Sequence, residues 1–355
     1  MTPSASVPFS RRLTSGWQRR GALACALLPI AALYLGLVSL HKWLYRSGLK
    51  KAQRLDCPVL VVGNAVAGGA GKTPTVIALV QHLRQQGLAV GVVSRGYGRH
   101  SRDTLEVSAQ SDPAEVGDEP LLIARATQAP VFVAAQRTSA ARALHRAHPE
   151  IQLIVCDDGL QHYPLYRDLE ICVFDDRGIG NGWVLPSGPL REPWPRSGVR
   201  QCGQSAATLL VLHTGAAPAF AGYRAQRQLA NYALQRNGQQ LPLQQLSAQR
   251  PLLALAGIAQ PEVFFSSLRQ AGVPLAQTLA LPDHCDFTTL DLSAWAGHQI
   301  LCTEKDAVKL WKHRPDALAV PLLQSMDAAL FTELEARLRP LLKSQLSSGH
   351  GHQTA

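Results

Sequence analysis

The sequence predicts an α/β protein made of two α/β/α domains, the larger one N-terminal and built on a mainly parallel sheet, with an apolar helix in front. Three observations support this prediction. Short apolar runs alternate with helical patterns from residue 55 onward, a glycine-rich loop follows the first run, and the uncharged stretch 21–40 precedes them all. Repeated strand–helix units of this kind form parallel sheets that helices cover on both faces.

The composition is typical of a globular chain, and the net charge favours an anionic partner. Its 355 residues are enough for about two domains. An apolar content of 46% and a charged content of 17% exclude an intrinsically disordered chain. The net charge of +10 favours a phosphorylated substrate or an anionic membrane surface, and no nucleic-acid partner is expected because no zinc-finger or RNA-recognition pattern is present. The seven cysteines contain no C-x-x-C pair, which is typical of the reducing cytosol.

The uncharged stretch 21–40 is long enough to cross the core of a bilayer. Basic residues flank both of its ends, so charge does not fix its orientation, and Pro29 would interrupt or kink a helix there. We interpret the stretch as a membrane-anchoring helix, either spanning the bilayer or lying in its interface, with the rest of the chain in the cytosol. The alternatives are a signal peptide, for which no convincing cleavage site follows, and a buried core helix.

The order of apolar runs predicts the elements of both domains. Strands of the larger domain are expected at 59–62, 88–94, 130–134, 151–156 and 169–174, and strands of the smaller one at 252–258, 277–281 and 299–302. Residues 200–250 are rich in Gln and Ala and read as a connection between domains. The predicted division is a basic segment with its membrane helix (1–50), a P-loop domain (51–225), a smaller α/β domain (226–343) and a disordered tail (344–355).

The glycine-rich loop after the first strand has the form of a phosphate-binding P-loop, with Lys72 and Thr73 at the start of an amphipathic helix. Lys72 is expected to reach the β- and γ-phosphates, and the Thr73 hydroxyl is expected to bind Mg²⁺. The strict pattern has a glycine where this chain has Val66, so the loop is of a compact form, and a chance glycine turn is the alternative. The residues expected to line the nucleotide phosphates are Ala67, Gly68, Gly69, Ala70, Gly71, Lys72, Thr73 and Pro74.

Two acidic residues, Asp157 and Asp158, end the apolar strand 151–156. A carboxylate in this position of a P-loop protein lies beside Mg²⁺. One of the pair could chelate the ion or orient its water, and the other could hold Lys72 or Thr73; the sequence leaves open which does which. An acidic helix cap after a strand is the alternative interpretation.

Phosphoryl transfer to an alcohol also needs a group that accepts the proton of the attacking hydroxyl. Asp118 and Glu119 follow a strand and are candidates, as is His284, which lies between Asp283 and Asp286 in the second domain. A lone histidine is more often structural than catalytic. Arginines could neutralise phosphate charge, although each could equally be a solvated surface residue: Arg95, Arg99, Arg137 and Arg191.

Taken together, these motifs resemble the tetraacyldisaccharide 4′-kinases of lipid A synthesis. The matching segments are 63–64, 68–74, 95–98, 116–120, 157–162, 185–193, 256–259, 282–287 and 303–306. The resemblance runs from the N-terminal membrane segment to about residue 340, and the combination of motifs is highly specific. Ser187 stands where the family usually has alanine, a departure that touches no proposed chemical role.

The resemblance implies that ATP phosphorylates the 4′-hydroxyl of a tetraacylated glucosamine disaccharide 1-phosphate. It implies a location at the cytoplasmic face of the inner membrane of a Gram-negative bacterium, with no obligate protein partner. Asp118 and His284 would form the dyad that activates the hydroxyl, in an active site between the two domains. Thr73, Asp158 and Glu119 would hold Mg²⁺. Positions with supporting roles around the phosphates and substrate would be Asp157, Arg137, Gln161, Arg191 and Glu192.

A second hypothesis comes from a different functional class. Compact glycine loops of this kind and membrane attachment also occur in P-loop ATPase or GTPase switches that act on a protein partner. The chain has no guanine-reading Asn-Lys-x-Asp pattern, which counts against a GTPase.

Overall fold

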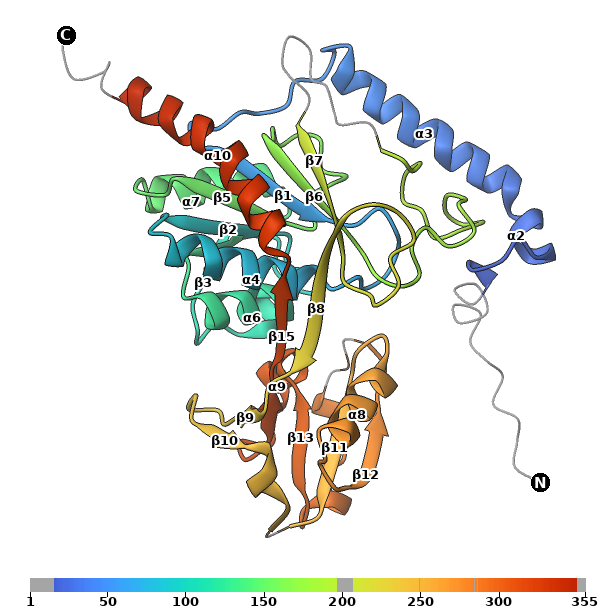
Figure 1. The fold of residues 1–355 in the computed structure, drawn as a ribbon, viewed down its shortest axis with the longest axis vertical. Helices are drawn as coiled ribbons and strands as arrows, with labels where there is room; N and C mark the ends of the chain where they lie inside the picture. The colour runs from blue at the N-terminus through green and yellow to red at the C-terminus, as the bar shows by residue number, and fades with distance from the viewer. Residues whose placement is uncertain (1–15, 197–206, 249, 284, 286, 350–355) are drawn as a thin grey trace. The chain divides into compact units, whose positions relative to one another are not determined.

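Figure 1 shows the computed structural model, which describes residues 16–196, 207–248, 250–283, 285 and 287–349. The chain divides into two compact units. The first comprises Met1–Lys72, Gln152–Ala225 and Met326–Ala355, and the second comprises Thr73–Ile151 and Gln226–Ser325. Both units are α/β, as the sequence predicts.

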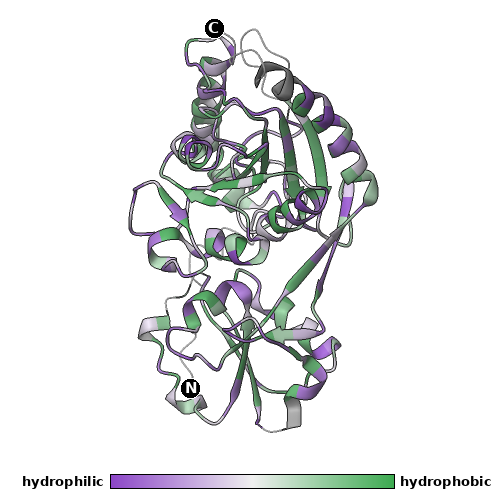
Figure 2. Cartoon of the chain, turned by 90° about the vertical axis from the view of Figure 1, so that its left-hand side faces the viewer, coloured by the Kyte–Doolittle hydropathy of each residue, from purple (hydrophilic) through white to green (hydrophobic). Residues whose placement is uncertain are grey.

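The first unit contains a parallel sheet whose central strands are completely buried. Its strands lie in the order β7 (Thr208–His213), β6 (Leu169–Phe174), β1 (Val59–Gly63) and β5 (Leu153–Asp157). Every residue of β1, β5 and β6 is buried, as expected for strands covered on both faces, and Figure 2 draws the inner strands in the hydrophobic colour. In the register of β1 and β5, Val62 pairs with Asp157, so the P-loop and the acidic pair leave the sheet at the same edge.

The predicted apolar helix is present as two helices, α2 (Ala22–Ala26) and α3 (Leu28–Arg46). Pro29 lies in the first turn of α3, where its missing N–H costs no hydrogen bond, so the chain breaks at Leu27 and α3 continues past the proline. By length and composition α3 could cross a membrane, and only 11% of its most apolar window is buried. This low burial contradicts the alternative of a buried core helix.

The first unit also contains α10 (Ala328–Gly349), which buries one face through Leu330, Leu334 and Leu338. The helix corrects the predicted disordered tail, because residues 344–349 continue it. Leucine, lysine and arginine in the preceding turns are good helix formers, and they carry the helix past the last buried leucine. The rest of the predicted tail, 350–355, lies outside the described residues.

The second unit contains a short three-stranded group with helices around it. The parallel pair β2 (Val90–Ser94) and β4 (Val131–Val133) is extended by the antiparallel β3 (Leu105–Val107). The helix α7 packs against β2 and β4. The helices of this part are α4 (Lys72–Gln85), α5 (Pro113–Val116), α6 (Asp118–Thr127) and α7 (Arg137–Ala147).

A six-stranded sheet forms the rest of the second unit. Its strand order is β10 (Gln240–Pro242), β9 (Tyr232–Leu234), β14 (Leu318–Val320), β13 (Gln299–Thr303), β11 (Leu252–Ala256) and β12 (Leu275–Ala280). Alternate residues of β11 enter two different apolar clusters, Leu252 and Ala254 one of them and Leu253 and Leu255 the other, so both faces of the sheet are covered. The remaining elements are α8 (Pro261–Gln270), α9 (Glu304–Leu310), β8 (Tyr223–Leu229), β15 (Leu322–Met326) and the 3-10 turns Leu243–Ala248, Phe287–Thr289 and Ser293–Trp295.

The region 200–250 differs from the sequence prediction. It was expected to be an irregular connection, yet residues 207–242 contain the strands β7 to β10. The sequence hides β8 because most of its side chains are polar and exposed, so it shows no apolar run. The predicted domain boundaries at 51–225 and 226–343 stay a prediction.

Candidate active site

The P-loop is held in shape by Asn64, a buried residue directly after β1. Its side-chain amide donates to the Gly68 carbonyl (2.9 Å), and its Oδ1 accepts from Lys72 Nζ (3.2 Å). Gly68 and Gly71 have φ values of +94° and +82°, which side chains disfavour. With α4 starting at Lys72, the loop therefore presents the N-terminus of a helix, a natural site for phosphate oxygens.

Two side chains that follow β6 and β7 fix the carbonyls of the same loop. Arg177 donates to the Gly69 carbonyl (2.7 Å) and is paired with Asp175 (2.8 Å). Thr214 donates its hydroxyl to the Ala70 carbonyl (2.9 Å). Neither Arg177 nor Thr214 was predicted as a site residue. The only signal in the sequence was their position just after an apolar strand.

Asp158 lies beside Lys72, as one of the sequence hypotheses required. Its Oδ1 is 3.5 Å from Lys72 Nζ and 3.1 Å from Arg191 Nη1. The backbone of Asp158 has φ +48°, a left-handed conformation that is uncommon for a residue with a side chain and that often occurs at functional turns. The neighbouring Asp157 is buried at the end of β5. The structure thus brings Lys72, Asp158 and Arg191 together.

Gln161 and Glu192 are hydrogen-bonded to each other and lie next to this group. The Gln161 amide donates to the Asn64 carbonyl (3.2 Å) and to Glu192 Oε1 (2.9 Å). Glu192 is completely buried and pairs with Arg196 (2.8 Å) and with Lys42 (2.5 Å). Burial alone would raise the pKa of Glu192, but Arg196, Lys42 and the Gln161 amide outweigh it, so the pKa lies below its ordinary value. Glu192 is therefore a fixed anion that orients its neighbours.

The predicted base Asp118 lies in the second unit, at the first residue of α6. Its carboxylate is largely buried and lies 2.9 Å from Lys309 Nζ. Its neighbour Glu119 lies 3.7 Å from Lys305 Nζ, which also binds Asp283 (3.1 Å). Both lysines belong to α9, and neither was predicted as a site residue, although Lys305 lies in the matching segment 303–306. Thr303 caps this helix, since its hydroxyl accepts from the Asp306 amide.

His284 lies outside the described residues, so its pairing with Asp118 stays a prediction. The structure does place Asp283, the residue before it, within reach of the lysine that also approaches Glu119. Asp283 is therefore connected through Lys305 to Glu119 in the first turn of α6.

Two glycine motifs meet directly in front of Asp118. A Cβ atom on Gly117 would lie 3.0 Å from Gly96 Cα, and a Cβ on Gly96 would lie 2.6 Å from the Val116 carbonyl oxygen. Both glycines have positive φ, +92° and +66°. The loops 95–98 and 116–120 thus touch backbone to backbone, and this contact fixes where α6 begins and where Asp118 lies.

Three other predicted residues are placed on helices of the second unit. Thr73 and Pro74 lie in the first turn of α4, and the next residue, Thr75, accepts a hydrogen bond from Gln324 (2.7 Å). Arg137 is the first residue of α7 and is buried.

Among the described residues, no group of three or more His, Cys, Asp or Glu side chains could hold a metal ion by itself. Mg²⁺ in nucleotide sites needs only one or two carboxylates, because substrate phosphates and water supply the other oxygens. Thr73 carries a hydroxyl, and Asp157 and Asp158 carry carboxylates, so these residues supply the oxygen donors that Mg²⁺ prefers. The residues present fit the ion.

Comparison with known proteins identifies the family. The model of the family "Tetraacyldisaccharide-1-P 4'-kinase" matches residues 23–346. The chain belongs to this family. It is 58% identical over 343 residues to the tetraacyldisaccharide 4′-kinase of Polaromonas sp. (strain JS666 / ATCC BAA-500), covering 96% of this chain and 99% of that one.

Further relatives of the kinase agree. The tetraacyldisaccharide 4′-kinase of Acidovorax sp. (strain JS42) is 52% identical over 350 residues, covering 98% of this chain and 99% of the relative. Among solved structures, LpxK from Aquifex aeolicus, described as an "apo" form in complex with ATP, superimposes with a TM-score of 0.74 at 26% identity. The match covers 91% of this chain and 99% of that one.

Proposed function

We propose that this kinase transfers the γ-phosphate of ATP to the 4′-hydroxyl of a tetraacylated glucosamine disaccharide 1-phosphate in lipid A synthesis. The observation that carries the proposal is the placement of Lys72 between Asn64 and Asp158 at the end of a P-loop, in a member of the 4′-kinase family. Family membership supports a kinase and does not support the alternative of a P-loop switch acting on a protein partner.

The P-loop residues have a defined part in this reaction. Lys72 and Arg191 supply positive charge for the oxygens of the transferred phosphoryl group, where charge builds up as the leaving bond breaks. Asp158 lies within 3.5 Å of both cations and keeps them in place before ATP binds. The helix N-terminus at α4 adds backbone N–H groups for the β-phosphate.

Asp118 accepts the proton of the attacking 4′-hydroxyl, with His284 as its partner in the dyad. Support comes from its position at the start of α6, behind two touching glycine loops, and from Lys309, whose ammonium group lies 2.9 Å from the carboxylate and fixes its position.

Mg²⁺ would be held by Thr73 and by one aspartate of the pair Asp157 and Asp158, with Glu119 as a further candidate ligand. When bound, the ion would neutralise negative charge on the phosphates of ATP. Glu119 lies near Lys305 in this structure, so its role as a ligand requires it to exchange that lysine for the ion. Arg137 and Gln161 are proposed to support the phosphates and the substrate.

The kinase is proposed to meet its acylated substrate at the cytoplasmic face of the inner membrane of a Gram-negative bacterium. Large apolar side chains on α3 and α2 are exposed, which supports a lipid-facing surface: Leu23, Leu28, Ile30, Leu33, Leu35, Leu37, Leu40 and Trp43. The surplus of basic residues suits an anionic lipid surface.

Activity with pure components tests the proposal. With ATP, Mg²⁺ and the acylated disaccharide 1-phosphate in mixed micelles, the wild-type enzyme should form the 4′-phosphorylated lipid, measured by mass spectrometry. Asp118→Asn should lower kcat by about 10²–10⁴-fold, the usual contribution of general base catalysis, while ATP binding is retained. Lys72→Ala should weaken both ATP binding and turnover. ATP hydrolysis that proceeds equally well without the lipid, and yields no phosphorylated sugar, would contradict the proposal.

A further inference from the structure

The helix α3 has two faces with different partners. One face carries Ala31, Tyr34, Val38, Lys42 and Tyr45, which are buried or half-buried at helical spacing along the whole helix. The other face consists of the exposed apolar residues Ile30, Leu33, Leu37 and Leu40, between 52% and 67% exposed, joined near the C-terminal end by Trp43. A helix with one face on protein and the other exposed and apolar has the pattern of a helix that lies along a membrane surface.

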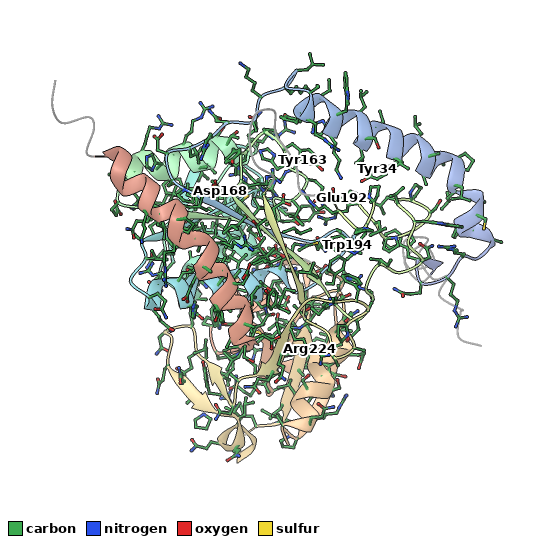
Figure 3. The ribbon with its side chains drawn as sticks, turned by 45° about the horizontal axis from the view of Figure 1, so that its top comes forward. Tyr34, Tyr163, Asp168, Glu192, Trp194 and Arg224 are labelled. Carbon is green, nitrogen blue, oxygen red and sulfur yellow. The ribbon has the colours of Figure 1, made fainter. Side chains whose placement is uncertain are left out.

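The inner face of α3 makes specific polar contacts with one segment, residues 181–192 and their neighbours. The Tyr34 hydroxyl donates to the Arg191 carbonyl (2.7 Å). Lys42 Nζ lies 2.5 Å from Glu192 Oε2. Figure 3 labels Tyr34 on α3 and Glu192 in the loop on its inner side, with Tyr163 close by. Near the C-terminal end of α3, Tyr45 packs against Tyr163, whose hydroxyl donates to Glu192 (3.3 Å).

The same segment is bound to the P-loop on its other side. The Arg191 amide donates to the Ala65 carbonyl (2.7 Å), and the Ala67 amide donates to the Pro189 carbonyl (2.7 Å). The Arg191 guanidinium reaches Asp158, which lies beside Lys72. A continuous chain of contacts therefore runs from the lipid-facing helix through residues 189–192 to the lysine of the P-loop.

These contacts exceed what a membrane anchor needs. An anchor requires only the outer, apolar face of α3, and it would work equally well on a flexible connection. Bringing a lysine to a completely buried carboxylate instead costs the hydration of both ions, which is recovered only in a well-ordered pair. The arrangement is explained if the position of α3 matters for the site itself.

From this geometry we infer that Tyr34 and Lys42 are positioning residues for phosphoryl transfer: they join α3 to Arg191 and Glu192 and so set the position of the Arg191 guanidinium beside Asp158 and Lys72. The inference rests on the proposed kinase function. It predicts that α3 contributes to turnover even where membrane binding does not limit the reaction.

The test uses full-length Lys42→Met and Tyr34→Phe in detergent mixed micelles that contain the acylated disaccharide. Lys42→Met should lower kcat by about tenfold, with the KM for the lipid changed by less than about threefold, because the lost contact orients a reacting group and does not bind the acyl chains. Tyr34→Phe removes one hydroxyl only and should lower kcat by about twofold to fivefold. Lys42→Arg retains the ion pair and should recover most of the turnover.

Lys51→Met is the matched control. It removes the same charge from an exposed lysine just beyond α3, and it should leave kcat and KM as in the wild type. Cosedimentation with vesicles of phosphatidylethanolamine and phosphatidylglycerol should be equal for Tyr34→Phe and the wild type, because the outer face of α3 is intact.

Hydrogen exchange gives a readout that does not depend on activity. In Lys42→Met the amides of residues 185–192 should exchange faster than in the wild type, while those of β1 remain protected. If wild-type protein made no phosphorylated lipid, the proposed function would fail, yet the exchange experiment would still test the connection. Wild-type kcat in both variants, together with unchanged exchange at 185–192, would overturn the inference.

Discussion

Two regions of the chain contain buried acidic side chains, and the pKa values of these side chains shift in opposite directions in the two regions. Around Glu170 and Glu192 in the first unit, the buried guanidinium groups of Arg167 and Arg196 lie within 3.2 Å of the carboxylates. The pKa of Glu192 is lowered there, because nearby cations outweigh burial. At the start of α9 in the second unit, burial raises the pKa of Glu304 to about 7, opposed only by a backbone hydrogen bond.

Asp306 lies two residues after Glu304 in α9 and is also buried. Burial raises its pKa, although hydrogen bonds from Thr303 and the Gly257 amide and the charges of Lys309 and Lys305 oppose the rise. The lysines of α9 make their close ion pairs with Asp118, Glu119 and Asp283. The comparison teaches that cations in contact with a buried carboxylate lower its pKa, as at Glu192, whereas burial raises the pKa of Glu304 and Asp306. In the first region the arginines pair directly with the buried carboxylates, and we call this cluster the ionic frame. In the second region the lysines of α9 pair with residues of the candidate site.

The largest expected effect comes from breaking the ionic frame. Arg196→Met leaves Glu170 and Glu192 buried without their shared partner, so the free energy of unfolding should fall by about 3–5 kcal/mol. Denaturant unfolding of the full chain measures it. A loss below about 1 kcal/mol would show that the cluster is not the fixed frame described above.

The next effect concerns pH in the second region. Because the pKa of Glu304 is higher in the folded chain than its ordinary 4.5, neutral Glu304 stabilises the fold fully below about pH 4.5, and this contribution is lost as the pH rises through about 7. The loss amounts to at most about 3.5 kcal/mol, at about 1.4 kcal/mol per pKa unit. Glu304→Gln should flatten the dependence of unfolding free energy on pH between about pH 5 and about pH 8. An unchanged slope in the variant would assign that dependence to another group.

A smaller change in stability, with a larger change in activity, is expected at Lys309. Its ion pair with Asp118 is 17% and 10% exposed, less buried than the pair of Arg196 and Glu192, so Lys309→Met should cost about 1–3 kcal/mol of unfolding free energy. Turnover should fall several-fold, because Asp118 loses the group that holds it. Lys312→Met is the matched control, since Lys312 pairs with Asp112 in a half-exposed contact and should leave turnover unchanged. Equal kcat values in the two variants would separate Lys309 from the proposed base.

The smallest effect is expected at an exposed ion pair that can be compared with the buried pair of Arg196 and Glu192. Arg337 and Glu333 form an ion pair at the same i, i+4 spacing as Arg196 and Glu192, but on the surface of α10. Arg337→Met should change the unfolding free energy by less than about 0.5 kcal/mol. A loss as large as that for Arg196→Met would mean that burial is not what distinguishes the two pairs.

Much of the fold and part of the site were predictable from the sequence. The strands β1 and β5 contain unbroken apolar runs, and β6 is apolar except for Glu170, so their positions and the loops after them could be read directly. The P-loop after β1 and Asp158 after β5 could be predicted from the order of these strands in the sequence. The polar strand β8 could not be predicted, because its side chains are mostly exposed and give no apolar run.

The missed site residues share a physical reason. Tyr34, Lys42, Arg177 and Lys309 act through contacts with residues more than a hundred positions away, and no local periodicity encodes such pairs. Lysine and arginine are also common on surfaces, so residue type alone does not single them out. Only the folded chain shows which of them meet a carboxylate or a loop carbonyl.

The two-faced helix α3 also has a practical consequence for preparing this enzyme. Deleting the N-terminal segment to obtain a detergent-free protein would remove Lys42 and leave the buried Glu192 short of a partner. Exchanging Leu33, Leu37 and Leu40 for glutamate or glutamine changes only the outward stripe and spares every polar contact of the inner face. A water-soluble form with an intact site is therefore obtained by substituting the exposed leucines of this helix and not by deleting the helix.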